Sequence, residues 1–292
     1  MSDILVHTEA GVMTLTFNRP DKKNSITGAM YARLADALEQ AAQDAAVRVV
    51  VIQGQDTVFS AGNDIGDFLN PLPSGAKKGR LRNRLMRALK RIPAPVITAL
   101  RGPAARIGTT FLLRDAPIYR FMRALRDFPK PVLAAVCGAA VGIGTTLLLH
   151  CDLVYAGENA VFSMPFVNLG LCPEFASSLL LPQMLGAHRA AEVLLLGEPF
   201  MAQTALEVGL ANRVLPITEV NAYAQAQALK LAAKPLSALI ETKRLLRKNQ
   251  QQAVSGRMTE EIQSFARLLL SPAAREAFTA FMEKRKPDFS KY

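Results

Sequence analysis

Three stretches of this chain hold residues that could do chemistry, namely 59–64 (FSAGND), 137–152 (CGAAVGIGTTLLLHCD) and 170–178 (GLCPEFASS). The second stretch follows an apolar β-branched run, and its glycines open an apolar helical pattern. A strand that leads through a glycine-rich turn into a buried helix presents free backbone N–H groups, which suit a developing negative charge. The third stretch places a carboxylate, Glu174, among apolar neighbours. Burial there raises the pKa of a carboxyl group toward the range in which it can act as a general base.

Some of these residues also have simpler interpretations. Glu174 follows a proline and could be an acid in the first turn of a helix, where the helix dipole favours it. Asn63, in the first stretch, could be a turn residue in a left-handed conformation. His150 lies in an apolar helical pattern and is expected to be a core histidine rather than a ligand. The sequence contains no metal-ligand cluster and no phosphate-binding Gly-x-x-x-x-Gly-Lys-Ser/Thr run.

The elements that must position these stretches alternate between strands and helices. A β-hairpin is expected from 4–7 and 12–17, then a helix at 27–46 and a buried strand at 47–54. Further strands are expected at 131–136, 153–156 and 161–164, and helices at about 174–184, 187–196, 202–208, 216–232, 235–250 and 255–284. This order favours an α/β sheet core followed by a helical C-terminal part.

Length and composition exclude several classes of protein. The chain has 292 residues, of which 50% are hydrophobic and 20% charged, as in a globular protein with a large core. No apolar run reaches the roughly 18 residues that span a bilayer, so no membrane partner is expected. The first residues lack the pattern of an export signal, and three cysteines without CxxC spacing fit a reducing compartment. A cytoplasmic location is therefore expected.

The net charge of +11 comes from one segment, which is also a copy. Residues 77–114 contain eleven basic and no acidic residues, and outside them basic and acidic residues balance at 24 each. Residues 85–114 align without gaps on 121–150 with sixteen of thirty positions identical. The segment could bind nucleic acid through its charge, but it lacks interleaved aromatic residues. We interpret it as a duplicated basic insertion, and nucleic acid is not the expected partner.

Four stretches in order resemble the crotonase (enoyl-CoA hydratase/isomerase) superfamily: NRPDKKNSIT, FSAGNDI, PKPVLAAVCGAAVGIG and FMEKRKPDF. The resemblance covers nearly the whole chain except the basic copy. It implies an α/β fold with a crotonase-like ββα spiral core. On this reading, residues 1–200 form the core, with 77–114 as the insertion, and residues 201–292 form the helical C-terminal part.

The resemblance also implies a site that binds an acyl-CoA thioester. The two backbone N–H groups that stabilise the thioester enolate fall on Asn63 and Ile143. The two glutamates of the hydratases fall on Thr146 and Phe166, so both acids are missing. Glu174 instead resembles the base of the peroxisomal-type Δ3,Δ2-enoyl-CoA isomerases, which lies in a PEG segment. Phe175 replaces that glycine and could crowd the pocket.

The same resemblance implies contacts to CoA, and no cofactor beyond the CoA moiety of the substrate and no metal are expected. The positions expected to bind CoA are Lys22, Ser60, Ala61, Gly62, Asp64, Ile65 and Lys284. For the two lysines, solvated surface positions are the alternative, and Asp64 is expected to order its loop rather than to do chemistry. The family commonly assembles as trimers or pairs of trimers, so a homotrimer or hexamer is expected.

The leading hypothesis is an enoyl-CoA delta isomerase of fatty-acid metabolism that converts 3-enoyl-CoA to 2-trans-enoyl-CoA. In it, Glu174 moves the proton from C2 to C4 while the enolate occupies an oxyanion hole. Two alternatives stay open. One is another crotonase reaction on acyl-CoA, by a hydratase or a thioester hydrolase. The other is a non-catalytic scaffold that uses the basic segment to bind nucleic acid or a membrane surface.

Overall fold

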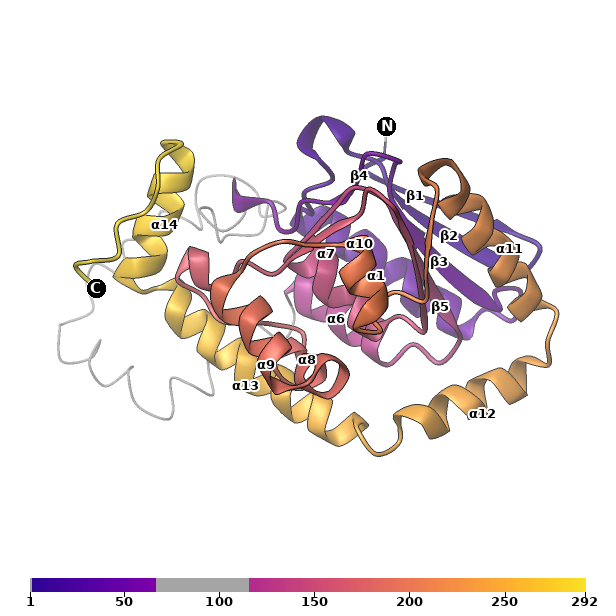
Figure 1. Ribbon diagram of the computed structural model, residues 1–292. Coiled ribbons are helices and arrows are strands. Elements are labelled where there is room, and N and C mark those ends of the chain that lie inside the picture. The colour runs from indigo at the N-terminus through magenta and orange to yellow at the C-terminus, as the bar shows by residue number, and fades with distance from the viewer. Residues whose placement is uncertain (1, 67–115) are drawn as a thin grey trace, which may run out of the picture.

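A six-stranded sheet forms the centre of the computed structural model, which describes residues 2–66 and 116–292 (Figure 1). The strand order is β1-β2-β3-β5-β7-β10, with β1 antiparallel to β2 and every other neighbouring pair parallel. The strands are β1 (Ile4–Glu9), β2 (Val12–Phe17), β3 (Val49–Gln53), β5 (Val132–Val136), β7 (Leu153–Gly157) and β10 (Arg213–Leu215). The mixed α/β fold predicted from the sequence is confirmed. The predicted basic insertion, 77–114, lies outside the described residues.

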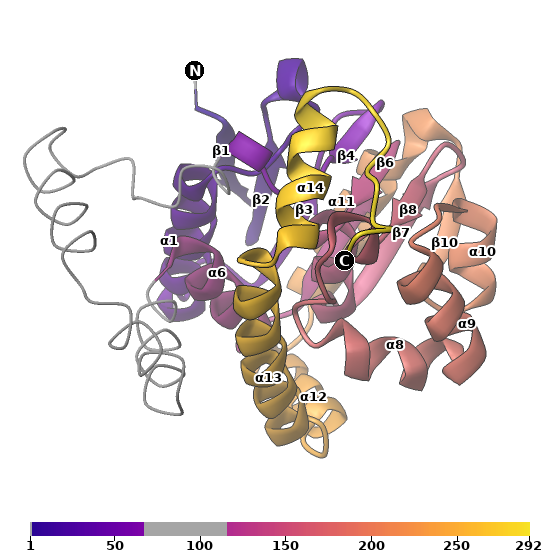
Figure 2. The same cartoon turned by 90° about the vertical axis from the view of Figure 1, so that its left-hand side faces the viewer.

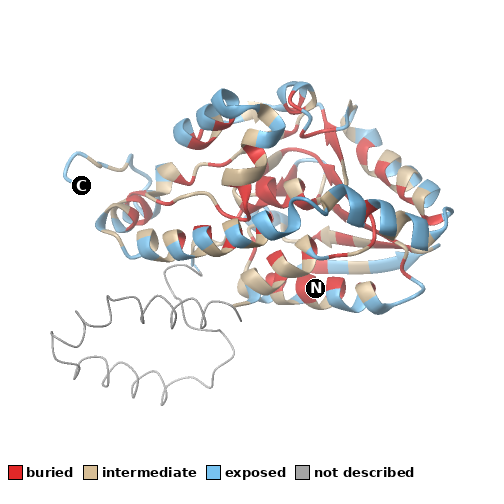
Figure 3. Cartoon of the chain, turned by 90° about the horizontal axis from the view of Figure 1, so that it is seen from below, coloured by how far each residue is buried: buried red, intermediate tan, exposed pale blue. Residues whose placement is uncertain are grey.

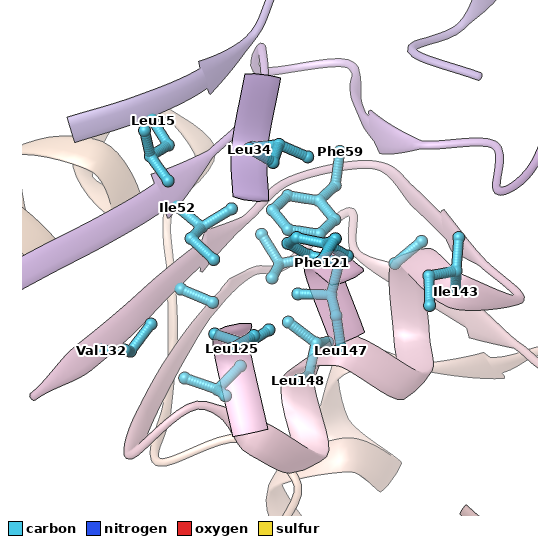
Figure 4. Packing of buried hydrophobic residues seen from close by; sticks show 14 of the residues in the cluster. Leu15, Leu34, Ile52, Phe59, Phe121, Leu125, Val132, Ile143, Leu147 and Leu148 are labelled. Atoms are coloured by element: carbon cyan, nitrogen blue, oxygen red, sulfur yellow. The ribbon is translucent and has the colours of Figure 1, made fainter. Parts of the chain in front are cut away.

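Helices cover both faces of this sheet, which explains the near-continuous apolar character of its central strands. In β3, Val50 and Ile52 pack in the main core with α1 (Gly28–Gln43) and α6 (Pro117–Arg126). Their neighbours Val49 and Val51 pack against α11 (Val220–Ala232) on the opposite face. The close view of the main core includes Phe59, Phe121 and Leu147, with Ile143 at its edge (Figure 4). Buried residues concentrate in the central strands (Figure 3).

A second, four-stranded sheet carries the turns that matter for function. Its order is β4-β6-β8-β9, and its strands are β4 (Val58–Ser60), β6 (Ala139–Val141), β8 (Val161–Ser163) and β9 (Phe200–Met201). β4 and β6 run parallel, with Ser60 paired to Ala140. The FSAG loop and the glycine-rich turn therefore leave the same edge of this sheet side by side.

The remaining elements are mostly helical, as predicted. After β6 and β8 come α7 (Ile143–Thr146), η2 (Leu147–His150), η3 (Val167–Leu169), α8 (Ser177–Leu185), α9 (Ala187–Ala191), η4 (Glu192–Leu196), α10 (Ala202–Glu207), η5 (Ile217–Glu219), α12 (Leu236–Arg247), α13 (Gln251–Leu269) and α14 (Pro272–Met282). A short η1 (Pro20–Lys22) precedes α1. α13 lies between α6 and α8 (Figure 2). No described helix is long and apolar enough to cross a membrane.

Several boundaries differ from the sequence prediction. The first hairpin turns at Ala10 and Gly11, both with positive φ, so β1 extends to Glu9. The helix expected at 255–284 is two helices, because Ser271 caps a new helix that has Pro272 at its first position. The helix expected from 174 begins at Ser177, which leaves Glu174 in the preceding loop. The four short strands β4, β6, β9 and β10 were not predicted.

Candidate active site

The two backbone N–H groups predicted to form an oxyanion hole are brought together by the pairing of β4 with β6. Ser60 faces Ala140, and Asn63 and Ile143 each follow three residues later. A Cβ added to Gly62 would stand 2.7 Å from the carbonyl oxygen of Val141, so the two loops are in backbone contact. Among the described residues, neither the N–H of Asn63 nor that of Ile143 donates to a protein acceptor. Neither amide is therefore used within the described part of the protein; Asn63 lines both cavities described below, whereas Ile143 is fully buried and lines neither of them.

Local structure fixes the backbone at both donors. Ile143 is the first residue of α7, where an N–H has no partner within the helix, and its side chain is wholly buried in the main core. Asn63 forms a bridge to Ile26, and the hydroxyl of Tyr31 donates to its Oδ1. Both donors are therefore preorganised, which is what stabilisation of a developing oxyanion requires.

Glu174 is buried, with 6% of its surface exposed, and among residues 2–66 and 116–292 its carboxyl group has one hydrogen-bond partner. The Thr146 hydroxyl donates to Oε1 at 2.9 Å. Thr146 belongs to α7, three residues after Ile143, so this short helix carries both an amide donor and the partner of the carboxyl group. The backbone of Glu174 is held too, because Ser177 donates to its carbonyl oxygen through N at 3.1 Å and Oγ at 2.6 Å.

The surroundings of Glu174 favour its neutral form. Desolvation raises its pKa to about 8, the hydrogen bond from Thr146 opposes this, and the charge of Glu261 adds to it. The charge of Glu174 in turn helps burial to raise the pKa of Tyr119 above its ordinary value. A carboxyl group with a pKa near 8 can both take up and release a proton at neutral pH.

Two cavities meet at Asn63. The small cavity, about 240 Å³, contains Glu174 in an otherwise mostly apolar lining: Ile26, Gly28, Tyr31, Asn63, Asp64, Ala116, Pro117, Ile118, Tyr119, Ile262, Phe265, Ala266 and Leu269. The large cavity, about 770 Å³, shares Asn63, Asp64 and Phe265 with it. At its basic end lie Arg19, Lys22 and Lys23. This arrangement suits a ligand with an anionic part in the large cavity and an apolar part in the small one.

Most residues predicted to bind CoA line the large cavity, which includes Lys22, Ala61, Gly62, Asp64 and Ile65. Two do not. Ser60 is fully buried, donates through Oγ to the carbonyl oxygen of Asn24 at 2.9 Å and accepts from the N–H of Gly62. Lys284 is exposed beyond the end of α14 and is not in the lining.

The contacts of Asp64 fit the loop-ordering role expected for it. Its Oδ2 forms an ion pair with Arg19 at 2.6 Å, and it accepts hydrogen bonds from Ser25 Oγ and the N–H of Gly66. Burial opposes ionisation, but these partners together hold the pKa of Asp64 below its usual range. The carboxylate of Asp64 therefore serves to hold the loop that carries Asn63 in place.

Phe175 does not crowd either cavity. Its side chain is buried with 1% exposed and stacks on His150, with the ring centroids 3.8 Å apart. His150 Nε2 is 2.8 Å from the carbonyl oxygen of Phe175, and desolvation lowers the pKa of the imidazole to about 3. His150 is thus the neutral core histidine that the sequence predicts.

The Enoyl-CoA hydratase/isomerase family model matches this chain over residues 7–115 and 113–292. The chain belongs to the enoyl-CoA hydratase/isomerase family. It is 32% identical over 289 residues to 2,3-dehydroadipyl-CoA hydratase of Escherichia coli, covering 99% of each chain. It is 33% identical to enoyl-CoA delta isomerase 2 of Rattus norvegicus over 97% of this chain and 64% of that protein. The solved structure of Pseudomonas aeruginosa OdaA is similar, with a TM-score of 0.82 and 45% identity over 97% and 99% of the two chains.

The protein is therefore a crotonase-family acyl-CoA enzyme, and its hydratase/isomerase fold is shared over nearly its whole length. The relatives include both hydratases and isomerases, so membership in the enoyl-CoA hydratase/isomerase family does not choose between these reactions. Within the described residues, Glu174 lines the small cavity. That Thr146 and Phe166 stand where hydratases carry their two acids stays a prediction from the sequence.

Three residues near the site were not identified from the sequence. Tyr31 holds Asn63, Arg19 holds Asp64, and Glu261 accepts hydrogen bonds from the loop after Glu174. Arg19 lies inside the NRPDKKN stretch and could have been found there as a charge partner for Asp64. Tyr31 and Glu261 lie in segments whose sequence shows only the apolar and polar spacing of an ordinary amphipathic helix. No feature of the sequence distinguishes either residue.

Proposed function

We propose that this enzyme isomerises 3-enoyl-CoA to 2-trans-enoyl-CoA, with Glu174 as the one acid–base group. The observation that supports this most is the buried carboxyl group of Glu174, which lines the same small cavity as Asn63 and accepts a hydrogen bond from Thr146. Isomerisation needs one group that removes a proton at C2 and returns it at C4. Hydration in this family uses two acids, and their positions here hold Thr146 and Phe166.

The proposed reaction begins with the ionised carboxylate of Glu174, which takes the proton from C2 of the thioester. The electron pair moves onto the thioester oxygen, which accepts hydrogen bonds from the N–H groups of Asn63 and Ile143. Loss of one such donor costs about 3–4 kcal/mol of transition-state stabilisation. The neutral Glu174 then donates the proton at C4, the electron pair returns, and the double bond lies between C2 and C3.

The two cavities fit the two halves of this substrate. Arg19, Lys22 and Lys23 at the large cavity would face the phosphates of CoA, and cations are the natural partners of phosphate. The apolar walls of the small cavity would receive the acyl chain near the double bond. The thioester would then lie where the cavities meet, at Asn63.

Purified enzyme should convert a 3-enoyl-CoA to the conjugated product, followed by the absorbance of the new enoyl thioester. The Glu174→Gln variant should lose at least about a thousandfold in kcat, as expected for removal of the sole acid–base group, and should still bind CoA. Glu158→Gln, the same change at an exposed position, is the matched control and should keep full activity. Full turnover by Glu174→Gln would place the base elsewhere. Hydration of a 2-enoyl-CoA at a higher kcat/KM than isomerisation would favour the hydratase alternative.

A further inference from the structure

A second buried carboxylate, Glu261 of α13, faces the loop that carries Glu174. It is 5% exposed. Its Oε2 accepts a hydrogen bond from the N–H of Ala176 at 2.5 Å, and its Oε1 accepts from the N–H and Oγ of Ser178 at 3.0 and 2.6 Å. Arg257, also on α13, donates to the same Ser178 hydroxyl at 3.1 Å. One side chain therefore binds three donors of a loop more than 80 residues away in the sequence.

The loop that Glu261 holds has an unfavourable backbone conformation. Phe175 and Ala176, the two residues after Glu174, have φ of +59° and +57°. A left-handed conformation costs a residue other than glycine about 1–2 kcal/mol, so two in succession need support from elsewhere. The stacking of Phe175 on His150 supplies part of it.

Glu261 also takes the place of a local helix cap. Ala176 is the N-cap of α8, and its methyl side chain makes no capping hydrogen bond. The first N–H groups of a helix need acceptors, and an unsatisfied buried N–H is costly. Glu261 accepts from the N–H groups of Ala176 and Ser178, and Ser177 between them closes the turn onto the carbonyl oxygen of Glu174.

We propose that Glu261 is a positioning residue for the reaction, which holds the turn after Glu174 so that its carboxyl group stays in the small cavity. This inference rests on the proposed function, because it assigns Glu261 a task only if Glu174 moves the proton. Glu261 itself acts through the loop amides and does not line either cavity among the described residues.

The charge of Glu261 acts on Glu174 as well. The groups that face Glu174 are the Thr146 hydroxyl from α7, Tyr119 from α6, Cys172 from its own loop, and Glu261 from α13. Of these, the charge of Glu261 raises the pKa of Glu174. Glu261 faces Arg257, Ser178 and Cys172, and its own pKa is raised by burial. Removal of its charge should therefore lower the pKa of Glu174.

The decisive variant is Glu261→Gln, which keeps the shape but loses the charge and one acceptor atom. We expect kcat for the 3-enoyl-CoA to fall about tenfold or more, with KM changed less than about twofold, since a hydrogen bond to a charged group is lost away from the substrate. The pKa of Glu174, followed by NMR titration of ¹³C-labelled glutamate carboxyl groups, should fall. Glu158→Gln changes an exposed glutamate outside this loop and α13 and should leave both readouts unchanged.

Rescue separates positioning from general loss of structure. Glycine adopts positive φ without strain, so adding Ala176→Gly to Glu261→Gln should restore part of kcat. Amide hydrogen exchange should be faster at Ala176 and Ser178 in Glu261→Gln, while the amides within α13 keep their protection. Wild-type kcat in Glu261→Gln, or reduced kcat with no change in the pKa of Glu174 and no rescue, would overturn the proposal. If the wild-type enzyme does not isomerise a 3-enoyl-CoA, the proposed function fails, while the titration and the exchange still report whether Glu261 holds the loop.

Discussion

At the scale of single residues, the carboxyl group of Glu174 makes the stability of the protein depend on pH. Its pKa is about 8 in the folded protein and near 4.5 in the unfolded chain. The folded state therefore binds more protons between these values. Stability is highest below pH 4.5 as far as this group is concerned, and it falls as the pH rises toward 8, by up to about 1.4 kcal/mol per pH unit.

Replacing Glu174 with Gln removes this titration. We expect the difference in Tm between Glu174→Gln and the wild type to grow in favour of the variant from pH 5 to pH 8, because only the wild type must bury a charge at the higher pH. Thermal unfolding followed by circular dichroism at both pH values measures it, with Glu158→Gln as control. A difference in Tm that is the same at pH 5 and pH 8 would show that the pKa of Glu174 is not raised.

At the same scale, the family motifs predict Asn63, Ile143 and Glu174 as the catalytic residues, and these roles stay predictions. Asn63 and Glu174 line one cavity, while Ile143 lies at the adjoining turn and lines neither cavity. Asp64 and His150 have the contacts expected of structural residues. Tyr31 and Glu261 could not be predicted, because their roles arise from contacts across 32 and 85 residues of sequence.

At the scale of elements, the site depends on the close approach of two turns. Gly62 has φ of +87°, and a Cβ there would stand 2.7 Å from the carbonyl oxygen of Val141. Both features exclude a side chain without a shift of the backbone. Since Asn63 follows directly, any such shift moves one of the two amide donors away from the other.

Gly62→Ala should therefore reduce kcat for the isomerisation by about a hundredfold, because a displacement near 1 Å at a reacting group costs that much. Tm should fall as well. Gly256→Ala is the matched control, since a Cβ at that position of α13 meets no atom within 4 Å. Alanine is the better helix former, so this variant should keep its activity with an equal or higher Tm. If Gly62→Ala retained wild-type kcat, the two turns would not be what holds the donors in place.

The length and pattern of each element explain why some strands and helix boundaries were not predicted from the sequence. Long periodic segments such as α1 and buried runs such as β3 and β5 were found because pattern and length agree. β4, β6, β9 and β10 have two or three residues each, too few for alternation to be visible. The break before α14 was signalled by Ser271 and Pro272, a cap followed by proline, but apolar spacing continued across it.

At the scale of the whole molecule, the two sheets of the described chain have different roles. The six-stranded sheet, covered on both faces, provides the core, and the four-stranded sheet carries the FSAG loop and the glycine-rich turn. The helices after β10 close the cavities through residues of α13 and α14. Homotrimer or hexamer formation stays a prediction; Leu245, Leu246 and Leu270, on or beside the C-terminal helices, are exposed apolar side chains that such an assembly could bury.

The central claim is that one buried carboxyl group carries the same proton from C2 to C4. The most direct measurement uses a 3-enoyl-CoA with two deuterium atoms at C2, in ordinary water, and locates the label in the product by NMR. Because Glu174 is only 6% exposed and exchanges its proton with solvent slowly, we expect a product with one deuterium left at C2 and, in a large share of molecules, one at C4. A product whose C4 hydrogen comes entirely from solvent would contradict it and would point to a route through water or through two separate groups.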